Sequence, residues 1–310
     1  MKKVALVIDN SSGMPQEDIE KLNVAKVIPI SFMVNGEEYY ENVNMSYSQF
    51  FDFLKDKNTN VSTSQPSIEV VKEGWREVLE DYDEIVHLLL SSGLSESCNS
   101  AMLASHDAEF EGKVFVVDNG GVAFLNKVPM FKARYMIDQG KSAKEIKEHL
   151  ESVKKEADAF IAVDTLKYLK KGGRITPAAA AIGTLLNIKP ILHVAGGGGK
   201  LDACAKVISF KLAKSKIISI VRKQIEEKYP EELKNGQVYI GMAHTMPDLE
   251  SKELKDFIAE IKNEFSDCKF FCCDPLPLFV TCHTGPGALA AGYIIDRTGA
   301  IDAMMKKKKN

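Results

Sequence analysis

Short apolar runs rich in β-branched residues alternate along the first half of the chain with longer amphipathic stretches. The runs predicted to be strands are VALVID (4–9), KVIPISFMV (26–34), EIVHLLL (84–90) and KVFVVD (113–118). Their near-continuous apolarity is typical of strands that are covered on both faces. Helices are predicted from Ser46, Ser67 and Ser95, because each serine can cap the free amides of a first helical turn. Asn35-Gly36 predicts a hairpin turn.

The second half repeats this alternation. A charged amphipathic helix is predicted over 142–158, and the strand FIAVD follows it. Further predicted strands are KPILHVA (189–195), QVYIGMAH (237–244) and CKFFCCD (268–274), with long helices between them and a hairpin connection at Gly196 to Gly199. The pattern predicts an α/β protein of two domains, residues 1–160 and 161–310, each with a mainly parallel sheet flanked by helices.

Charge and composition exclude several classes of protein. The 310 residues carry a net charge of -3, which argues against nucleic acid as a partner, and the terminal KKKKN is expected to be a solvated tail. The start MKKVALVIDN is predicted to be a strand rather than a signal peptide, and no apolar run is long enough for a membrane span, so we expect a cytoplasmic protein without integral membrane association. The six cysteines form no C-x-x-C pair, and neither a metal nor a cofactor is predicted.

Hydroxyl groups gather in three short segments where a strand is predicted to end and a helix to start. These segments are STSQPS (62–67), SSGLSES (91–97) and His283 to Gly287. Strand carboxyl ends and helix amino ends share one edge of an α/β sheet, where free amides favour an anion. Capping alone is the ordinary explanation for any one of the segments. Three segments at a shared edge favour a binding site.

The surrounding residues indicate which anion would bind. No G-x-x-x-x-G-K-[ST] or G-x-G-x-x-G loop is present, so a nucleotide is not indicated. The neighbours of His283 are apolar, from Leu276 to Val280 and from Ala288 to Ala290. A ligand with one carboxylate and a long hydrocarbon tail would match both features.

A fourth segment, LKYLKKGGRIT (166–176), predicts a short helix that ends at a glycine pair. Gly172 is expected to be left-handed and to leave Arg174 on a turn. Arg174 is then either an ordinary surface arginine or a residue whose planar guanidinium is directed at a carboxylate or phosphate of a partner.

Together these stretches resemble the DegV family. The resemblance rests on TSQPS, SSGLS, LKYLKKGGRI followed by GTLLNIKPIL, and HTGPGALAAG, with VIDNS near the amino end. It implies two α/β domains with a long-chain fatty acid such as palmitate, roughly C14 to C18, buried between them so that its tail stays dry. It also implies a non-catalytic protein that presents the acyl group to a separate fatty-acid kinase subunit, which forms an acyl phosphate.

The resemblance assigns roles residue by residue. Thr63 and Ser95 are expected to donate hydroxyl hydrogen bonds to the carboxylate, with His283 nearby, and Arg174 matches an arginine implicated in the kinase partnership. Ser95 is favoured over Ser91 and Ser92 because it starts a helix. The remaining residues expected around the carboxylate are Ser92, Gly93 and Thr284.

Three segments depart from the family pattern. Glu96-Ser97-Cys98 follows SSGLS where the family has Gly-Thr and an aromatic residue, and a carboxylate there would weaken anion binding unless it faces solvent. DNGGVAFLNKVPM (118–130) lacks the usual small residues, which affects the expected tunnel shape and acyl preference. ACAKVIS (203–209) lacks an arginine, which affects the expected partner surface.

An enzyme is the alternative. Ser95 or Ser92 with His283 could form a serine hydrolase, although Gly93 to Ser97 fails G-x-S-x-G at its last position. His283 could also be the nucleophile of a phospho- or carbonyl-transfer protein, because the family fold is similar to a dihydroxyacetone kinase domain that uses a histidine.

Overall fold

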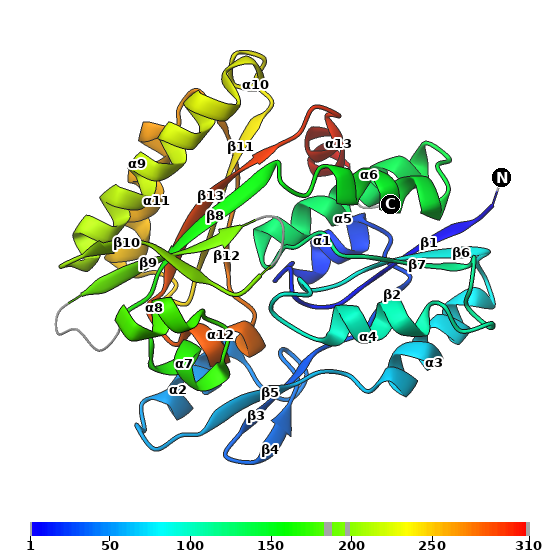
Figure 1. Ribbon diagram of the computed structural model, residues 1–310, viewed down its shortest axis with the longest axis horizontal. Helices are drawn as coiled ribbons and strands as arrows, with labels where there is room; N and C mark the ends of the chain where they lie inside the picture. Colours follow the sequence, from blue (N-terminus) through cyan, green and yellow to red (C-terminus); the bar gives the residue numbers. More distant parts are fainter. Residues whose placement is uncertain (1, 183–187, 196–198, 308–310) are drawn as a thin grey trace.

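The computed structural model describes residues 2–182, 188–195 and 199–307, which form three sheets with helices around them (Figure 1). The predicted α/β class is confirmed. Residues 196–198 of the hairpin connection predicted at Gly196 to Gly199, part of GTLLNIKPIL and the end of the lysine tail lie outside the described residues.

The first sheet is entirely parallel. Its strands, in spatial order, are β2 (Lys26–Val27), β1 (Val4–Ile8), β6 (Glu84–Leu88) and β7 (Val114–Val117). Alternate residues of β1 enter two different cores: Val4 and Leu6 pack on one side of the sheet, and Ala5 and Val7 on the other. Burial on both faces explains why these strands are continuously apolar in the sequence.

The second sheet corrects the prediction that both sheets are mainly parallel. Its six strands, in spatial order, are β10 (Asp202–Val207), β9 (Lys189–Ala195), β8 (Ala157–Ala162), β13 (Leu289–Ile295), β11 (Val238–His244) and β12 (Lys269–Pro275). Only β11 and β12 run parallel, and the other neighbours are antiparallel. Buried antiparallel strands have the same apolar sequence signature as parallel ones, so the pattern could not distinguish them. The division predicted after residue 160 falls inside β8, and the placement of a domain boundary stays a prediction.

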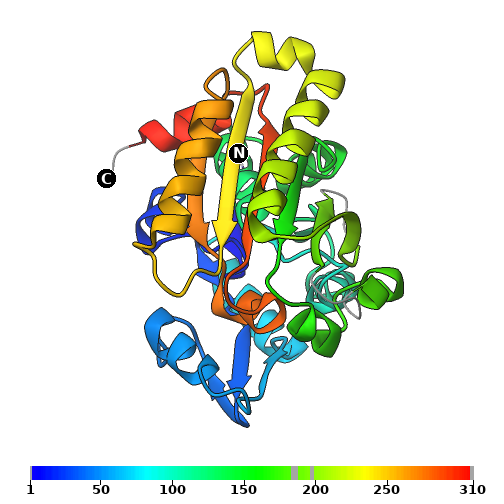
Figure 2. The ribbon, with the colours of Figure 1, turned by 90° about the vertical axis from the view of Figure 1, so that its left-hand side faces the viewer.

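A third, small sheet lies at one end of the molecule (Figures 1 and 2). It consists of β4 (Glu37–Tyr39), β3 (Ser31–Val34) and β5 (Val61–Ser64), all antiparallel. The predicted Asn35-Gly36 turn joins β3 to β4, and both turn residues have positive φ, 53° and 92°. The run 26–34, predicted as one strand, is divided between β2 and β3 in different sheets.

The helices surround and separate the two larger sheets. Their bounds are α1 (Gln16–Lys21), α2 (Tyr47–Leu54), α3 (Ile68–Leu79), α4 (Ser97–Ala104), α5 (Phe124–Asp138), α6 (Ala143–Ser152), α7 (Lys167–Gly172), α8 (Pro177–Ile182), α9 (Phe210–Lys228), α10 (Pro230–Lys234), α11 (Lys252–Glu264), α12 (Leu278–Thr284) and α13 (Ala300–Lys306). Ser46 and Ser67 cap α2 and α3 as predicted. The helix predicted over 142–158 is shorter, because α6 ends at Ser152.

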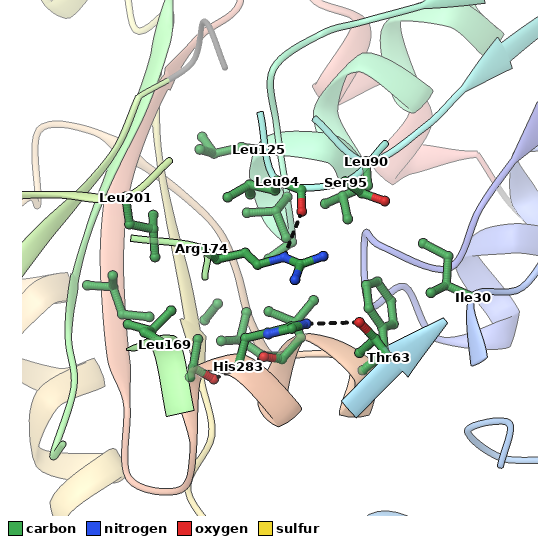
Figure 3. A pocket seen from close by; sticks show the side chains of 18 of the residues that line it. Ile30, Thr63, Leu90, Leu94, Ser95, Leu125, Leu169, Arg174, Leu201 and His283 are labelled. Atoms are coloured by element: carbon green, nitrogen blue, oxygen red, sulfur yellow. Dashed lines mark hydrogen bonds between the residues drawn. The ribbon is translucent and has the colours of Figure 1, made fainter. Parts of the chain in front are cut away.

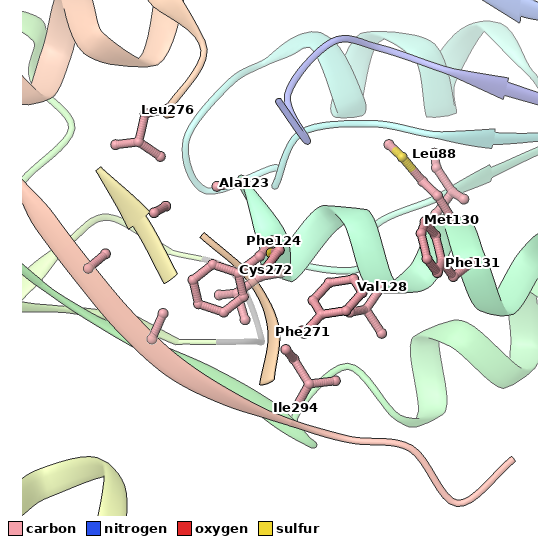
Figure 4. Close-up of a cluster of buried hydrophobic side chains, with 14 of the residues drawn as sticks. Leu88, Ala123, Phe124, Val128, Met130, Phe131, Phe271, Cys272, Leu276 and Ile294 are labelled. Carbon is pink, nitrogen blue, oxygen red and sulfur yellow. The ribbon is translucent and has the colours of Figure 1, made fainter. Parts of the chain in front are cut away.

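Helix α5 lies between the two larger sheets and carries the largest apolar core (Figure 4). Phe124, Val128 and Phe131 pack there with residues of both sheets, such as Leu88 and Ile294. Helices α9 and α11 cover the far face of the six-stranded sheet (Figure 2), and α3 and α4 cover the far face of the parallel sheet. The molecule is therefore a stack of five layers with α5 in the middle.

Candidate functional site

A cavity of about 330 Å³ opens between the three sheets, next to the amino end of α5 (Figure 3). Its wall is mostly apolar, with small residues on three central strands: Ala159 on β8, Ala243 on β11 and Ala290 on β13. Ala243 and Ala290 are register partners, and so are Ala290 and Ile161. The space exists because these short side chains leave the strands uncovered where larger residues would fill the gap beneath α5.

Thr63 and His283 meet at one end of this cavity although they are 220 residues apart. Thr63 lies on β5 and His283 on α12, and Thr63 Oγ1 is 3.0 Å from His283 Nε2. Burial, with a smaller contribution from the positive charge of Arg174, lowers the pKa of His283 to about 4. The imidazole is therefore neutral at neutral pH.

The other nitrogen of His283 identifies its tautomer. Among the described residues Nδ1 has no hydrogen-bond partner and is buried. A side chain at Gly172 would collide with Nδ1, so the glycine lets α7 pack directly on the ring. Buried N–H groups without an acceptor are rarer in proteins than buried acceptors without a donor. We therefore assign the proton to Nε2, which donates to Thr63 Oγ1 and leaves the threonine hydroxyl hydrogen free for another acceptor.

Arg174 lines the same cavity, a position that neither of the two interpretations of its turn had predicted. It is half-buried, its Nε donates to Leu94 O at 3.2 Å and its Nη1 to Gly172 O at 2.5 Å. Figure 3 shows the guanidinium extending between Ser95 and His283. Within residues 2–182, 188–195 and 199–307 no carboxylate forms an ion pair with it, so its charge faces the cavity unbalanced.

Ser95 also lines the cavity, at the start of α4. Its hydroxyl accepts from Ser97 N at 3.2 Å and lies 2.8 Å from Ser97 Oγ. The helix begins at Ser97 with Glu96 at the N-cap, one residue later than the predicted capping residue Ser95, and it ends at Ala104. Glu96 is exposed and accepts from Asn99 Nδ2 at 3.0 Å, so its carboxylate faces away from the cavity.

Ser92 and Gly93 do not line the cavity. Ser92 Oγ donates to Asp118 Oδ2 at 2.7 Å, and Gly93 packs so closely on the backbone of Gly199 that a side chain could not fit. Ser91 is buried, and its hydroxyl accepts from Gly93 N at 3.3 Å. Thr284 lines the wall, but its hydroxyl donates to Val280 O within α12. These four residues shape the loops, while Thr63, Ser95, Arg174 and His283 provide the polar end.

Two predictions about glycines need correction. His283 to Gly287 was predicted to precede a helix, but α12 ends at Thr284 and β13 starts at Leu289. Gly285 has a φ of 73°, and the ring of Tyr168 occupies the place of a side chain there. At the end of α7, Gly173 is the left-handed residue, with a φ of 68°, whereas Gly172 is still helical.

A buried polar network holds the loops around the cavity, and the sequence analysis assigned it no role. Asp9 follows β1, and its carboxylate accepts from Leu90 N at 2.7 Å and from Ser11 N at 2.9 Å. Ser11 Oγ accepts from Asn126 of α5. Burial raises the pKa of Asp9, and hydrogen bonds from Ser11 and Leu90 oppose that shift. The network ties the loop that carries Ser95 to the start of α5.

In the part of the chain that the structure describes, no three potential metal-ligating side chains come together, and no helix has the length and apolarity to cross a bilayer. All six cysteines are free, and Cys204 is the exposed one.

Comparisons with known proteins agree with this arrangement. The family described as "Uncharacterised protein, DegV family" matches residues 3–296. A DegV domain-containing protein of Deinococcus radiodurans is 32% identical over 288 residues, which is 92% of this chain and 96% of the relative. A fatty-acid-binding DegV family protein of Thermus thermophilus has a TM-score of 0.81 at 27% identity, covering 95% of this chain and 100% of the other. DegV of Bacillus subtilis, a fatty acid binding protein, has a TM-score of 0.81 at 26% identity over 96% of this chain and 100% of the other. The resemblance seen in the sequence is confirmed, and the chain belongs to the DegV family.

Proposed function

We propose that this protein binds a long-chain fatty acid in the cavity and has no catalytic activity of its own. The single observation that carries the proposal is an apolar cavity of about 330 Å³ whose polar residues gather at one end. A fatty acid has the same division between a hydrocarbon tail and one charged group. The fatty-acid-binding relatives from Thermus thermophilus and Bacillus subtilis support the same ligand class.

The carboxylate would lie among Thr63, Ser95, His283 and Arg174. With the proton of His283 on Nε2, the imidazole donates to Thr63 Oγ1 and the threonine hydroxyl donates to the carboxylate. Ser95 adds a second hydroxyl, and Arg174 supplies the positive charge that a buried anion requires. Glu96 is directed away and leaves this end of the cavity free of negative charge.

The tail would supply most of the affinity. Transfer of each methylene from water contributes about 0.8 kcal/mol, and losses of translational and conformational freedom offset part of the sum. We propose a chain of roughly C14 to C18, palmitate among them, as the resemblance to the DegV family implies. We place the protein in the cytoplasm, where the acyl group would be presented to a fatty-acid kinase subunit, and Arg174 at the polar end would assist that transfer.

The hydrolase alternative has less support. A serine nucleophile needs a hydrogen bond to its histidine, and the histidine needs an orienting carboxylate. The Ser95 hydroxyl contacts Ser97, and His283 contacts Thr63. No carboxylate of the described residues contacts His283.

Native mass spectrometry of the protein purified from cells tests the proposal. We expect a co-purified fatty acid that is lost from the Thr63→Ala, Ser95→Ala double variant. Ser62→Ala is the matched control, because Ser62 lies next to Thr63 on β5 but is exposed. If the wild type carries no fatty acid and hydrolyses an ester, and if Ser95→Ala abolishes that hydrolysis, the protein is a hydrolase rather than a carrier. A phosphate or carbonyl adduct on His283 would favour the transfer protein.

The kinase step has its own test. A fatty-acid kinase subunit and ATP should yield acyl phosphate only when this protein is present, and Arg174→Gln should lower the yield. Formation of acyl phosphate at the same rate without the protein would refute the presentation role.

A further inference from the structure

Leu125, in the first turn of α5, lines two separate cavities. One is the cavity described above, and the other, termed the deeper cavity, is a space of about 30 Å³ that lies farther along β8, at Ala157. In Figure 3 Leu125 lies away from Thr63 and His283, on the far side of the cavity. The residues around the deeper cavity come mainly from α5, α6 and the ends of β8 and β13, among them Val128, Leu150, Ala157 and Ile294.

The two cavities follow one another along the same strands. On β8, Ile161 and Ala159 line the larger cavity, and Ala157 lines the deeper one. Their partners on β13 are Ala290, Gly292 and Ile294, in that order. Residues two apart point to the same face of a sheet, so these three pairs form one continuous surface directed at α5. The Leu125 side chain lies between the two cavities that adjoin this surface.

We infer that Leu125 is the residue that sets the maximum length of the bound acyl chain. The inference rests on the proposed function, because it places the carboxylate at the end of the cavity formed by Thr63 and His283. The chain then extends along β8 toward Ala159, and its terminal methyl group stops at the Leu125 side chain. A shorter side chain at position 125 joins the two cavities and admits a longer chain.

The deeper cavity also limits how far such a chain could extend. Lys132, Glu156 and Asn119 contribute to its wall, and Lys132 Nζ donates to Ile295 O at 3.0 Å. A methyl group pushed against these polar groups would displace their hydrogen bonds. Joining the two cavities should therefore lengthen the longest chain that binds by only a few carbon atoms.

Competition among saturated fatty acids of roughly C12 to C22 tests the inference. The purified protein is equilibrated with an equimolar mixture, and native mass spectrometry gives the occupancy of each chain length. In Leu125→Ala we expect the occupancy ratio of C20 to C16 to rise by about tenfold or more, the discrimination typical of a few methylenes in an apolar pocket. Leu169→Ala is the matched control, because Leu169 lines only the larger cavity and lies beside His283 in Figure 3.

Two further variants keep the test decisive. Ala157→Leu added to Leu125→Ala fills the deeper cavity and should return the ratio to the wild-type value. If Leu125→Ala does not fold, Leu125→Val removes less of the side chain and should shift the ratio in the same direction by a smaller factor. An unchanged ratio in the folded Leu125 variants, or an equal rise in Leu169→Ala, overturns the inference while the proposed function stands. A wild type that binds no fatty acid overturns both.

Discussion

The two ends of the cavity are constructed in opposite ways. The apolar end consists of small side chains on neighbouring strands, Ala159, Ala243 and Ala290, whose positions follow from strand register. The polar end combines side chains from four separate elements or loops, which carry Thr63, Ser95, Arg174 and His283. Regular structure thus sets the volume available to a tail, while tertiary contacts set the chemistry available to a head group. Affinity and head-group selectivity should therefore be separable by mutation.

The largest effect is expected from blocking the apolar end. Ala290→Phe places a ring in the middle of the cavity and should weaken fatty-acid binding by about 100-fold or more. Several methylenes would no longer be buried, and each contributes about 0.8 kcal/mol of transfer free energy. Ala290→Val should give an intermediate loss. Titration with a fluorescent fatty acid measures both constants. Wild-type affinity in Ala290→Phe would show that the tail lies elsewhere.

A smaller effect, confined to the polar end, is expected from Arg174→Gln. Loss of the unbalanced guanidinium should weaken binding of a fatty acid by about tenfold, because a hydrogen bond to a charged group contributes about 1.5–3 kcal/mol. The fatty alcohol of equal length carries no charge and should bind both proteins alike. Isothermal titration with the two ligands makes the comparison. An equal loss for acid and alcohol would mean that Arg174 acts through the shape of the cavity.

The smallest effect concerns the titration of His283. Burial and Arg174 hold its pKa at about 4 in the ligand-free protein, well below the ordinary 6.5. Arg174→Gln should raise this pKa by removing a like charge, and a bound fatty-acid carboxylate should raise it by favouring the imidazolium. Between pH 4 and pH 6.5 the His283 imidazole binds fewer protons in the folded protein than in the unfolded chain. Its contribution to the free energy of unfolding therefore falls as the pH drops from 6.5 toward 4.

NMR titration of the imidazole carbon-bound protons measures the His283 pKa in each state. His87 is a useful internal reference, because burial lowers its pKa to about 3 and it lies in another core, where it accepts from Trp75. Its pKa should not respond to Arg174→Gln. A His283 pKa near 6.5 in the ligand-free wild type would contradict the neutral, buried imidazole.

Much of the fold could be predicted from the residues, and the reasons are local. The strands of the parallel sheet are apolar because both faces are covered, and Ser46 and Ser67 are capping residues at helix starts. The antiparallel order of the second sheet could not be predicted, since burial on both faces removes the alternation that distinguishes such strands. Gly285 was assigned to the start of a helix, whereas it follows the end of α12, the position where glycine is most strongly enriched in helices.

The candidate site could be predicted only as a set of loops. The segments containing Thr63, Ser95 and His283 were identified, and the structure brings all three to one cavity. The contact between Thr63 and His283 joins positions 220 residues apart, and no local pattern indicates it. The inward direction of Arg174 was missed for the same reason, because Leu94 O, which holds the guanidinium, is 80 residues away in the sequence.

The small sheet fixes which hydroxyl reaches His283. Strand β5 reads Val61-Ser62-Thr63-Ser64, so a slip of one position would turn Thr63 to the opposite face and bring a serine hydroxyl to the face that meets His283. The alignment is secured at the far end, where Asn35 and Asn60 exchange hydrogen bonds: Asn35 N donates to Asn60 O at 2.8 Å, and Asn60 N to Asn35 Oδ1 at 2.9 Å. The hydrogen bonds at this tight turn, remote from the cavity, thus set the register of β5 and with it the position of Thr63.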